Sequence, residues 1–441
     1  MTRCLTPIAL AAALAGGLAL APLPARAQVE IQWWHSMTGA LGERVTELAT
    51  GFNASQTGYK VVPVYKGSYP ESMTGAIAAY RAGNPPHIVQ VFEVGTATMM
   101  AAQGAIKPVH QLMKDAGQPF DAKAYLPAVA GYYTDRKGNM LSMPFNSSTP
   151  VFYVNEEAFK KAGLPPKAPA TWKEFGVVAG KLKASGQACV YTTGWPAWVH
   201  VENFSAWHNL PIGTLENGIG GVKTEFRINS PAHVAHVQML ADFARNGWFT
   251  YAGRKNEAEA KFFSGECAML TSSSGAQANI RKNAKFPFSV NLLPYHDTVA
   301  GAPQNSIIGG ASLWVMGKKK PEEYKGVAQF LSYLSKTDLQ VKWHEQTGYV
   351  PITLAAYDAA KKAGYYDKVP GADIAVRQLT YKAPTANSKG LRFGNYVQGR
   401  EVIEEEIEAV LAGKKTAQAA MDEAVRRGNE LLRRFEATAK E

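Results

Sequence analysis

The 441-residue chain lacks the motifs that build the commonest catalytic sites. It has three cysteines and no C-x-x-C pair, and we find no G-x-S-x-G elbow, no H-E-x-x-H pair and no Walker A loop. After residue 27, no segment has the long uncharged apolar run of a transmembrane helix. We therefore predict a chain with no catalytic residue, no bound metal and no cofactor.

Acidic residues are in the minority, with 36 Asp and Glu against 47 Lys and Arg, a formal net charge of +11. The basic residues are scattered or gathered in C-terminal helices, without the interleaved aromatics of a nucleic-acid reader, so we expect no nucleic-acid partner. A basic balance fits an anionic ligand. The length and the 46% apolar content are typical of a soluble globular chain with two or more domains.

The first 27 residues differ in character from the rest. Arg3 supplies a positive charge, residues 8–20 are apolar, and Ala25-Arg26-Ala27 has the small residues of a cleavage site. This pattern is typical of a secretory signal peptide, whereas a membrane anchor needs a longer apolar stretch. We predict that residues 1–27 are removed and that the exported, soluble chain starts at Gln28. Export permits a disulfide between the two remaining cysteines, Cys189 and Cys267, but spacing alone leaves two buried thiols equally open.

Strand and helix patterns alternate from residue 28. Strands are expected at 28–34, 61–65 and 88–92, with helices between them, which is typical of an α/β layer with a parallel sheet. Pro63 favours an edge position for the second strand. Ligands bind beyond the carboxyl ends of such strands, where Trp34, Tyr69 and Glu93 fall. Glu93 is open to two interpretations, a structural cap or an acceptor for ligand hydroxyls.

Asn146-Ser147-Ser148-Thr149 lies between Pro144 and Pro150 and between two strand-like runs. Each proline pushes the preceding residue towards extended geometry, so we expect an extended segment with exposed amides and hydroxyls. It is either a polar loop or a crossing that joins two lobes and lines the cleft between them. Residues 288–293 are interpreted as a second crossing strand.

Four later segments have both a functional and a structural interpretation. Trp195 and Trp198, after a strand at 189–193, either stack on ligand C–H surfaces or pack in the core. Residues 272–275 lie between a strand and a helix. This arrangement forms either a binding site for an anion or a simple N-cap of the helix. His233 and His236, one turn apart, have metal-ligand spacing, but no third ligand is evident and we expect an ordinary helix face. Gly309 and Gly310 interrupt a strand at 306–315, indicating a bulge or a close approach by ligand.

Six blocks of sequence carry a resemblance to a known family: residues 34–37, 93–100, 144–150, 202–207, 307–316 and 426–435. The chain resembles the periplasmic solute-binding proteins of ABC importers related to maltose-binding protein, and among them those specific for sn-glycerol 3-phosphate. The resemblance covers essentially the whole mature chain. It implies a type II two-lobe fold with hinge crossings and a ligand cleft. It divides the chain into an N-terminal lobe, 28–145 plus 293–335, and a C-terminal lobe, 146–292 plus 336–441.

The resemblance also implies the site, the ligand and the partners. The expected ligand is sn-glycerol 3-phosphate, with glycerophosphodiesters such as glycerophosphocholine as further ligands. The expected partners are two transmembrane permease subunits coupled to cytoplasmic ATPase subunits, and the free binding protein is expected to be monomeric in the periplasm. The matching binding positions are Tyr69, Glu93, Ser148, Trp195, Ser273, Gly310, Tyr349 and Arg400.

The chemistry of these residues suits such a ligand. Arg400 offers a planar fork to phosphate oxygens, and Ser148 and Ser273 offer hydroxyls. Gly310 permits close backbone approach, each tyrosine donates one O–H, and Trp195 would cover the carbon chain. Glu93 would repel phosphate, so we expect it at the far end of the ligand from Arg400, facing the glycerol hydroxyls. Two alternatives remain open: the same fold with a neutral sugar or oligosaccharide, and an exported hydrolase.

Overall fold

The computed structural model describes residues 1–2, 28–102 and 104–439, so the predicted signal peptide lies outside the described residues from residue 3 onward. The strands form two sheets, a five-stranded sheet of order β2-β1-β3-β9-β4 and a four-stranded sheet of order β6-β7-β5-β8. Their bounds are β1 (Val29–His35), β2 (Tyr59–Tyr65), β3 (Ile88–Phe92), β4 (Met143–Ser148), β5 (Pro150–Asn155), β6 (Cys189–Thr193), β7 (Cys267–Ser273), β8 (Phe288–Asn291) and β9 (Gly309–Val315).

The first sheet is mixed, so the expectation of a parallel sheet is only partly confirmed. Strands β1, β2 and β3 are parallel, and β2, which contains Pro63, is at the edge as predicted. Strand β9 is antiparallel to both β3 and β4, and it enters this sheet after the chain has passed through the other one. Phe92 pairs with Ala311 and Ser147 with Gly310, so β3 and β4 end where β9 begins. One edge of the sheet thus gathers Glu93, Ser148 and Gly310.

The segment around Ser148 changes sheets, and it is extended as predicted. Strand β4 ends at Ser148 in the first sheet, and β5 begins at Pro150 in the second. Thr149 lies between them, and its carbonyl accepts a hydrogen bond from the backbone N–H of Ser274 at 3.0 Å. Pro150 pairs with Ser273 of β7, so the end of β7 lies beside this change of sheet.

The return to the first sheet differs from the expected crossing at 288–293. Strand β8 stays within the second sheet, paired with β5. Residues 292–308 form no regular strand or helix, and β9 begins at Gly309, three residues later than the strand expected from residue 306. A strand in the first sheet therefore starts only where Gly309 reaches the edge of β4. The lobe boundaries proposed from sequence stay a prediction.

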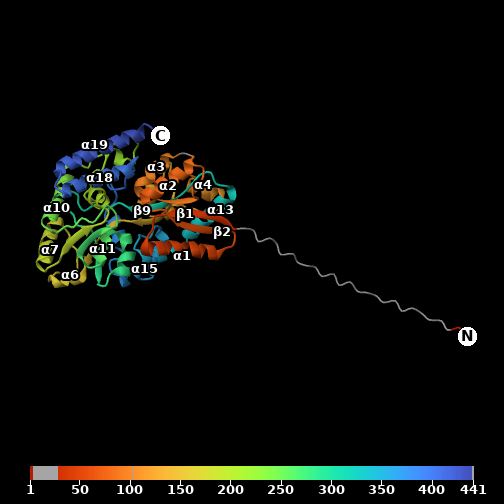
Figure 1. Cartoon of the computed structure of the whole chain (residues 1–441), viewed down its shortest axis with the longest axis horizontal. Coiled ribbons are helices and arrows are strands. Elements are labelled where there is room, and N and C mark those ends of the chain that lie inside the picture. The colour runs from red at the N-terminus through yellow and green to blue at the C-terminus, as the bar shows by residue number, and fades with distance from the viewer. Residues whose placement is uncertain (3–27, 103, 440–441) are drawn as a thin grey trace.

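The helices flank the two sheets on separate sides of the molecule, with α1 to α4 and α13 around the first sheet and α6, α7, α10, α18 and α19 around the second (Figure 1). Their bounds are α1 (Gly39–Ser55), α2 (Tyr69–Arg81), α3 (Thr96–Ala101), α4 (Val109–Asp115), α5 (Pro127–Tyr133), α6 (Glu156–Lys161), α7 (Trp172–Ala184), α8 (Phe204–Trp207), α9 (Thr214–Asn217), α10 (Pro231–Arg245), α11 (Ala258–Phe263), α12 (Gln277–Asn283), α13 (Pro321–Leu334), α14 (Thr337–Thr347), α15 (Leu354–Lys362), α16 (Tyr365–Lys368), α17 (Ile374–Leu379), α18 (Tyr396–Leu411) and α19 (Ala417–Glu436).

The second sheet is fastened by a disulfide between Cys189 of β6 and Cys267 of β7, which are partners in the parallel register. This pairing decides the alternative that the sequence left open. The aromatic side chains of Phe152, Phe175 and Tyr191 pack beside it in a core of their own. The bond thus ties together two strands that lead, at Thr193 and Ser273, towards the loops at the end of the sheet.

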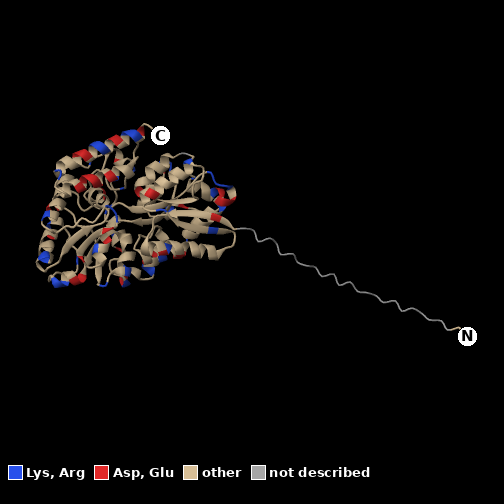
Figure 2. Ribbon diagram, in the orientation of Figure 1, with Lys and Arg blue, Asp and Glu red and all other residues tan. Residues whose placement is uncertain are grey.

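Residues of both charge signs are interspersed along the ribbon, and basic and acidic residues alternate along α19 (Figure 2). Among the described residues, no helix is long and apolar enough to cross a membrane.

Candidate ligand-binding site

A cavity lies between the two sheets and holds about 950 Å³ of space, its mouth included. Both sheets and the helices at their edges contribute to its wall. All eight positions predicted from the sequence line it: Tyr69, Glu93, Ser148, Trp195, Ser273, Gly310, Tyr349 and Arg400. They come from eight separate parts of the chain, spread over more than 300 residues, and the fold brings them to one place.

The edge of the first sheet supplies the polar residues of one wall. Glu93 directly follows β3, opens a 3-10 turn and is 3% exposed. The hydroxyl of Tyr69, the first residue of α2, accepts a hydrogen bond from the Asn146 amide at 3.1 Å, which leaves its own O–H free to donate. The Ser148 side chain is buried at the end of β4 and makes no hydrogen bond to a described residue. Two hydroxyl donors and one carboxylate therefore face the cavity from this side.

Position 310 requires glycine, for a reason that the sequence did not reveal. Gly310 has a φ of +92°, a left-handed conformation that L side chains rarely adopt. A Cβ there would lie 1.8 Å from the carbonyl oxygen of Asn146. The group that comes close to Gly310 is thus the backbone of the neighbouring strand β4. Because the two strands lie this close together, the backbones of both border the cavity.

The second sheet supplies the opposite wall. Ser273 ends β7, and its hydroxyl accepts from the backbone N–H of Gly275 at 3.1 Å, so the serine caps a 3-10 turn and still has a proton to donate. The ring of Tyr349 lies against Gly275, where a Cβ would come within 2.6 Å of it. Burial raises the pKa of both Tyr349 and Tyr69, which keeps these phenols protonated as hydrogen-bond donors.

Trp195 lines the cavity from a strained backbone. Its φ is +54°, a left-handed value that costs a bulky residue about 1–3 kcal/mol and is usual only where the surroundings enforce it. The backbone N–H of Trp195 donates to the carbonyl of Lys255 at 2.8 Å. Trp198 also lines the cavity, from a π-helix of residues Trp198–Asn203, and is 4% exposed. Both tryptophans are therefore wall residues, and Trp198 is packed in the core as well.

Arg400 of α18 joins the two walls. Its Nε and Nη2 donate to the two carboxylate oxygens of Glu202, at 2.7 and 2.6 Å. Nη2 also donates to Oε1 of Glu93 at 2.6 Å. The expectation that Glu93 and Arg400 lie at opposite ends of the ligand is therefore wrong. Because all three side chains are buried, each glutamate needs the guanidinium as its counter-charge.

Burial and ion pairing oppose each other in this triad. Burial raises the pKa of Glu93, although the nearby guanidinium favours its charged form. Burial alone would lower the pKa of Arg400, but Glu202 and Glu93 together raise it. The Nη1 group of Arg400 makes no hydrogen bond to a described residue, so it is the donor left for a ligand.

Several residues that line the cavity, and Glu202, which binds Arg400 without lining it, were not predicted from the sequence. Glu202 lies in one of the blocks that carry the resemblance, but nothing there indicated its role. Lys255 and Asn256 reach the cavity from the loop before α11, Glu259 from α11 and Asn279 from α12, and no local pattern marked them. Burial raises the pKa of Glu259 to about 7. The amide oxygen of Asn279 accepts from the backbone N–H of Ala40 at 3.2 Å, which links α12 to the start of α1.

The histidine pair on α10 is used within the core. His233 hydrogen-bonds the hydroxyls of Ser205 and Ser230, each at 2.7 Å. His236 bonds to two further histidines, His200 and His296, each at 3.0 Å. Within the described part of the chain, no group of three or more His, Cys, Asp or Glu residues is arranged to hold a metal ion. The pair therefore lies on the buried face of α10, where both side chains are bonded to neighbouring residues of the core.

Solved structures share this architecture. The UgpB protein of Mycobacterium tuberculosis in complex with glycerophosphocholine superposes with a TM-score of 0.77 at 22% identity, covering 93% of this chain and 100% of that one. Maltose-bound MalE3 of T. maritima has a TM-score of 0.74 at 18% identity, covering 91% and 100%. At these identities the likeness shows a common fold, the two-lobe maltose-binding-protein-like fold predicted from the sequence.

Relatives with much higher identity span nearly the whole chain. The sn-glycerol-3-phosphate-binding periplasmic protein UgpB of Pectobacterium atrosepticum is 53% identical over 431 residues, 97% of each chain. The protein of the same name from Yersinia pseudotuberculosis is 54% identical over 414 residues, 93% of this chain and 94% of that one. Residues 47–369 match the model of the bacterial extracellular solute-binding proteins. The chain belongs to the bacterial extracellular solute-binding protein family.

Proposed function

We propose that this protein binds sn-glycerol 3-phosphate in the periplasm and delivers it to the membrane permease of an ABC importer. The permease would consist of two transmembrane subunits coupled to cytoplasmic ATPase subunits, and the free binding protein would be a monomer without catalytic activity. Curated relatives that bear this ligand and this compartment in their names support the assignment, since they are 53–54% identical over nearly the full length.

The observation that carries the proposal is the convergence of Tyr69, Glu93, Ser148, Trp195, Ser273, Gly310, Tyr349 and Arg400 on one cavity. A phosphate monoester with a short polyol arm needs nearly all its polar atoms paired once water is excluded. The cavity offers both kinds of partner. Hydroxyls and the free Nη1 of Arg400 are donors for phosphate oxygens, and Glu93 is an acceptor for glycerol hydroxyls.

The contact between Glu93 and Arg400 changes how the ligand would lie. Since these two side chains touch, the ligand cannot separate them, and its phosphate-to-glycerol junction would sit against the pair. Glu93 uses one oxygen on Arg400 and offers the other to a hydroxyl. Glu202 neutralises the inner side of the guanidinium, so Ser148, Ser273 and Tyr349 would share the phosphate charge through hydrogen bonds.

Lobe closure would follow from this arrangement. Glu93 and Ser148 belong to the first sheet, whereas Ser273 and Trp195 belong to the second or its loops. A ligand that contacts both sides stabilises the closed form by those added contacts. The fold of this chain is shared by a UgpB protein in complex with glycerophosphocholine, a ligand that carries a substituent on its phosphate. We therefore include glycerophosphodiesters among the ligands.

A thermal-shift screen of the purified protein tests the proposal. A ligand that binds only the native state raises the unfolding temperature, in proportion to the logarithm of its concentration over Kd. Glycerol 3-phosphate should give a clear shift and glycerophosphocholine a second one, while maltose and inorganic phosphate should give little. A shift with maltose alone would support the neutral-sugar alternative, and release of phosphate or choline from the ligands would support a hydrolase.

A further inference from the structure

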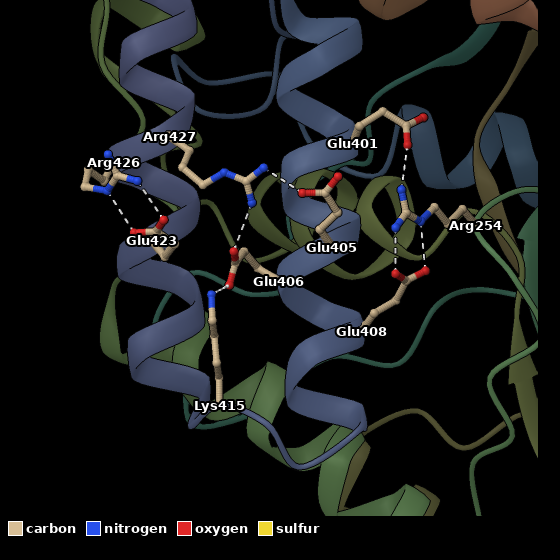
Figure 3. A network of polar contacts seen from close by, with 9 residues as sticks. All are labelled: Arg254, Glu401, Glu405, Glu406, Glu408, Lys415, Glu423, Arg426 and Arg427. Atoms are coloured by element: carbon tan, nitrogen blue, oxygen red, sulfur yellow. Dashed lines mark hydrogen bonds and ion pairs between the residues drawn. The ribbon is translucent and has the colours of Figure 1, made fainter.

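Arg254 lies outside the cavity, yet its side chain makes a three-pronged contact with the helix that carries Arg400. Its Nε and Nη2 donate to the two carboxylate oxygens of Glu408, at 2.8 and 2.6 Å. Its Nη1 donates to Glu401 at 2.8 Å. Figure 3 shows the guanidinium lying between the two glutamates, which project from α18 two turns apart. All the nitrogens of the fork are thus engaged by one helix.

The loop that carries Arg254 is bonded to β6 at its first residue, Thr250, whose N–H donates to the carbonyl of Tyr191 at 2.9 Å. Residues 250–257, between α10 and α11, form no regular element, and Gly253 has a φ of +127°. The Tyr251 hydroxyl donates to Glu408 at 2.6 Å, so two side chains of the loop share one anchor on α18. The next two residues, Lys255 and Asn256, line the cavity. The fork on Glu401 and Glu408 therefore sets where this part of the wall lies relative to α18.

The anchored loop in turn holds Trp195. The carbonyl of Lys255, one residue after Arg254, accepts from the backbone N–H of Trp195 at 2.8 Å. The φ of Trp195 is +54°, a conformation that persists only when its surroundings enforce it. On the other side of this tryptophan, the backbone N–H of Ala197 donates to Glu404 of α18 at 2.8 Å. The strained residue is thus fixed from both sides by contacts that lead back to one helix.

We propose that Arg254 is a positioning residue for ligand binding. Through the Lys255 carbonyl, it holds Trp195 at a fixed position relative to Arg400. This inference rests on the proposed function. A guanidinium fork is needed because three N–H groups must reach two carboxylates at once, which a lysine ammonium cannot do in the same plane. Helix α18 then acts as a common frame: it bears Arg400 on its cavity side and aligns the tryptophan wall through Glu401, Glu404 and Glu408.

Arg426 offers a matched control. It also binds two glutamates, Glu423 at 2.8 and 2.7 Å and Glu430 at 2.5 Å, but its side chain is 58% exposed on α19. Figure 3 shows the pair with Glu423. Arg426→Ala therefore removes a comparable set of ion pairs without touching the cavity wall. Arg254→Lys keeps the charge of Arg254 and removes the fork, and it serves where Arg254→Ala folds poorly.

The first measurement needs no ligand. Hydrogen exchange of the ligand-free protein, followed by mass spectrometry on peptides covering residues 193–199, reports the Trp195 amide. Arg254→Ala and Arg254→Lys should speed exchange there by about tenfold or more, because the local opening that they permit is rare in the wild-type chain. Arg426→Ala should leave it unchanged. Wild-type exchange in both Arg254 variants would overturn the proposal, whatever the protein binds.

The second measurement is a double-mutant cycle with Trp195. Calorimetry with glycerol 3-phosphate should show that Arg254→Ala weakens affinity about tenfold in the wild-type background and less than twofold in the Trp195→Ala background. Equal losses in the two backgrounds would overturn the proposed route through Trp195. A wild-type protein that does not bind glycerol 3-phosphate would instead contradict the proposed function, and the exchange measurement would still decide the role of Arg254.

Discussion

Arg400 and Glu93 are 307 residues apart in the sequence, yet Nη2 of Arg400 donates a hydrogen bond to Oε1 of Glu93 at 2.6 Å. Both residues line the cavity between the two sheets. Glu202 binds the same guanidinium in a bidentate manner. One cation therefore compensates two buried carboxylates, and it also faces the space that the ligand is proposed to fill. Stability and binding are coupled at this point, and substitutions here affect both.

Removal of Arg400 should damage folding as well as binding. Arg400→Ala leaves Glu93 and Glu202 buried without a counter-charge, and we expect a loss of about 3–5 kcal/mol in the free energy of unfolding. The pair of substitutions Arg400→Met and Glu202→Gln removes one of the two unpaired carboxylates and should restore part of that stability without restoring affinity for glycerol 3-phosphate. Urea denaturation and calorimetry of both proteins separate the two effects. Full affinity in the double variant would show that Arg400 makes no contact with the ligand.

The Tyr349 hydroxyl can be removed with little structural cost. Its O–H lies 4.0 Å from the sulfur of Met37, a weak contact, and its ring packs against Gly275. Tyr349→Phe keeps the ring, so the unfolding temperature should hardly change, while affinity for glycerol 3-phosphate should fall by about 0.5–1.5 kcal/mol. Tyr80→Phe is the control, because the Tyr80 hydroxyl donates to the carbonyl of Gly104 at 3.0 Å and does not line the cavity. Unchanged binding by Tyr349→Phe would remove this hydroxyl from the site.

The disulfide should matter more for stability than for ligand affinity. Cys189 and Cys267 are 78 residues apart, and a native bond of this kind typically contributes about 2–5 kcal/mol. Replacing both cysteines by alanine should therefore lower the unfolding temperature clearly. Affinity should change little, since neither sulfur lines the cavity. A protein whose unfolding temperature does not respond to reducing agent would contradict the paired state of the two thiols.

The buried histidines should make stability sensitive to acid. Burial lowers the pKa of His200 and His208 to about 3 and that of His233 to about 4. Below pH 6.5 the unfolded chain binds protons at these sites and the native chain does not, so their contribution falls as the pH falls towards 4. Each such group removes up to about 2 kcal/mol of stability between pH 7 and pH 5.

Two buried carboxyl groups act in the opposite direction. Burial raises the pKa of Glu259 to about 7 and that of Glu404 to about 8, so between pH 7 and pH 5 the native state holds protons on these groups that the unfolded chain lacks, and their contribution to stability grows as the pH falls. The decisive comparison is therefore between the wild-type protein and His233→Asn. Urea denaturation at pH 7 and pH 5 should show a smaller acid-induced loss in the variant. Equal losses would mean that His233 does not stay neutral in the native state.

Local patterns were enough to predict much of the fold. The alternation of strand and helix located β1, β2 and β3, Pro63 marked the edge strand, and two prolines marked the extended change of sheet at Thr149. The antiparallel insertion of β9 was not visible, because it depends on the path of the chain through the second sheet. Periodicity records which residues face a core, and it contains no information about the order of strands separated by more than 200 residues.

The candidate site was predictable where residues stand at strand ends or match the family pattern. Its electrostatics were not. The contact between Glu93 and Arg400 arises from tertiary packing, and the same holds for Glu202, Lys255 and Asn279, which no local motif marks. Gly310 was singled out as a point of close approach, but the neighbour turned out to be the carbonyl of Asn146. Residue chemistry alone therefore identified residues of the site, but it did not predict which of them contact one another.

The most direct test of the central claim is calorimetry of the wild-type protein with glycerol 3-phosphate, glycerol and inorganic phosphate. If the cavity recognises both the phosphate and the polyol arm, glycerol 3-phosphate should bind with one-to-one stoichiometry and at least 100-fold more tightly than either fragment, since each half forfeits about 3 kcal/mol of charge-assisted and neutral hydrogen bonds. Equal affinity for glycerol and glycerol 3-phosphate, or no binding of either, would contradict the account.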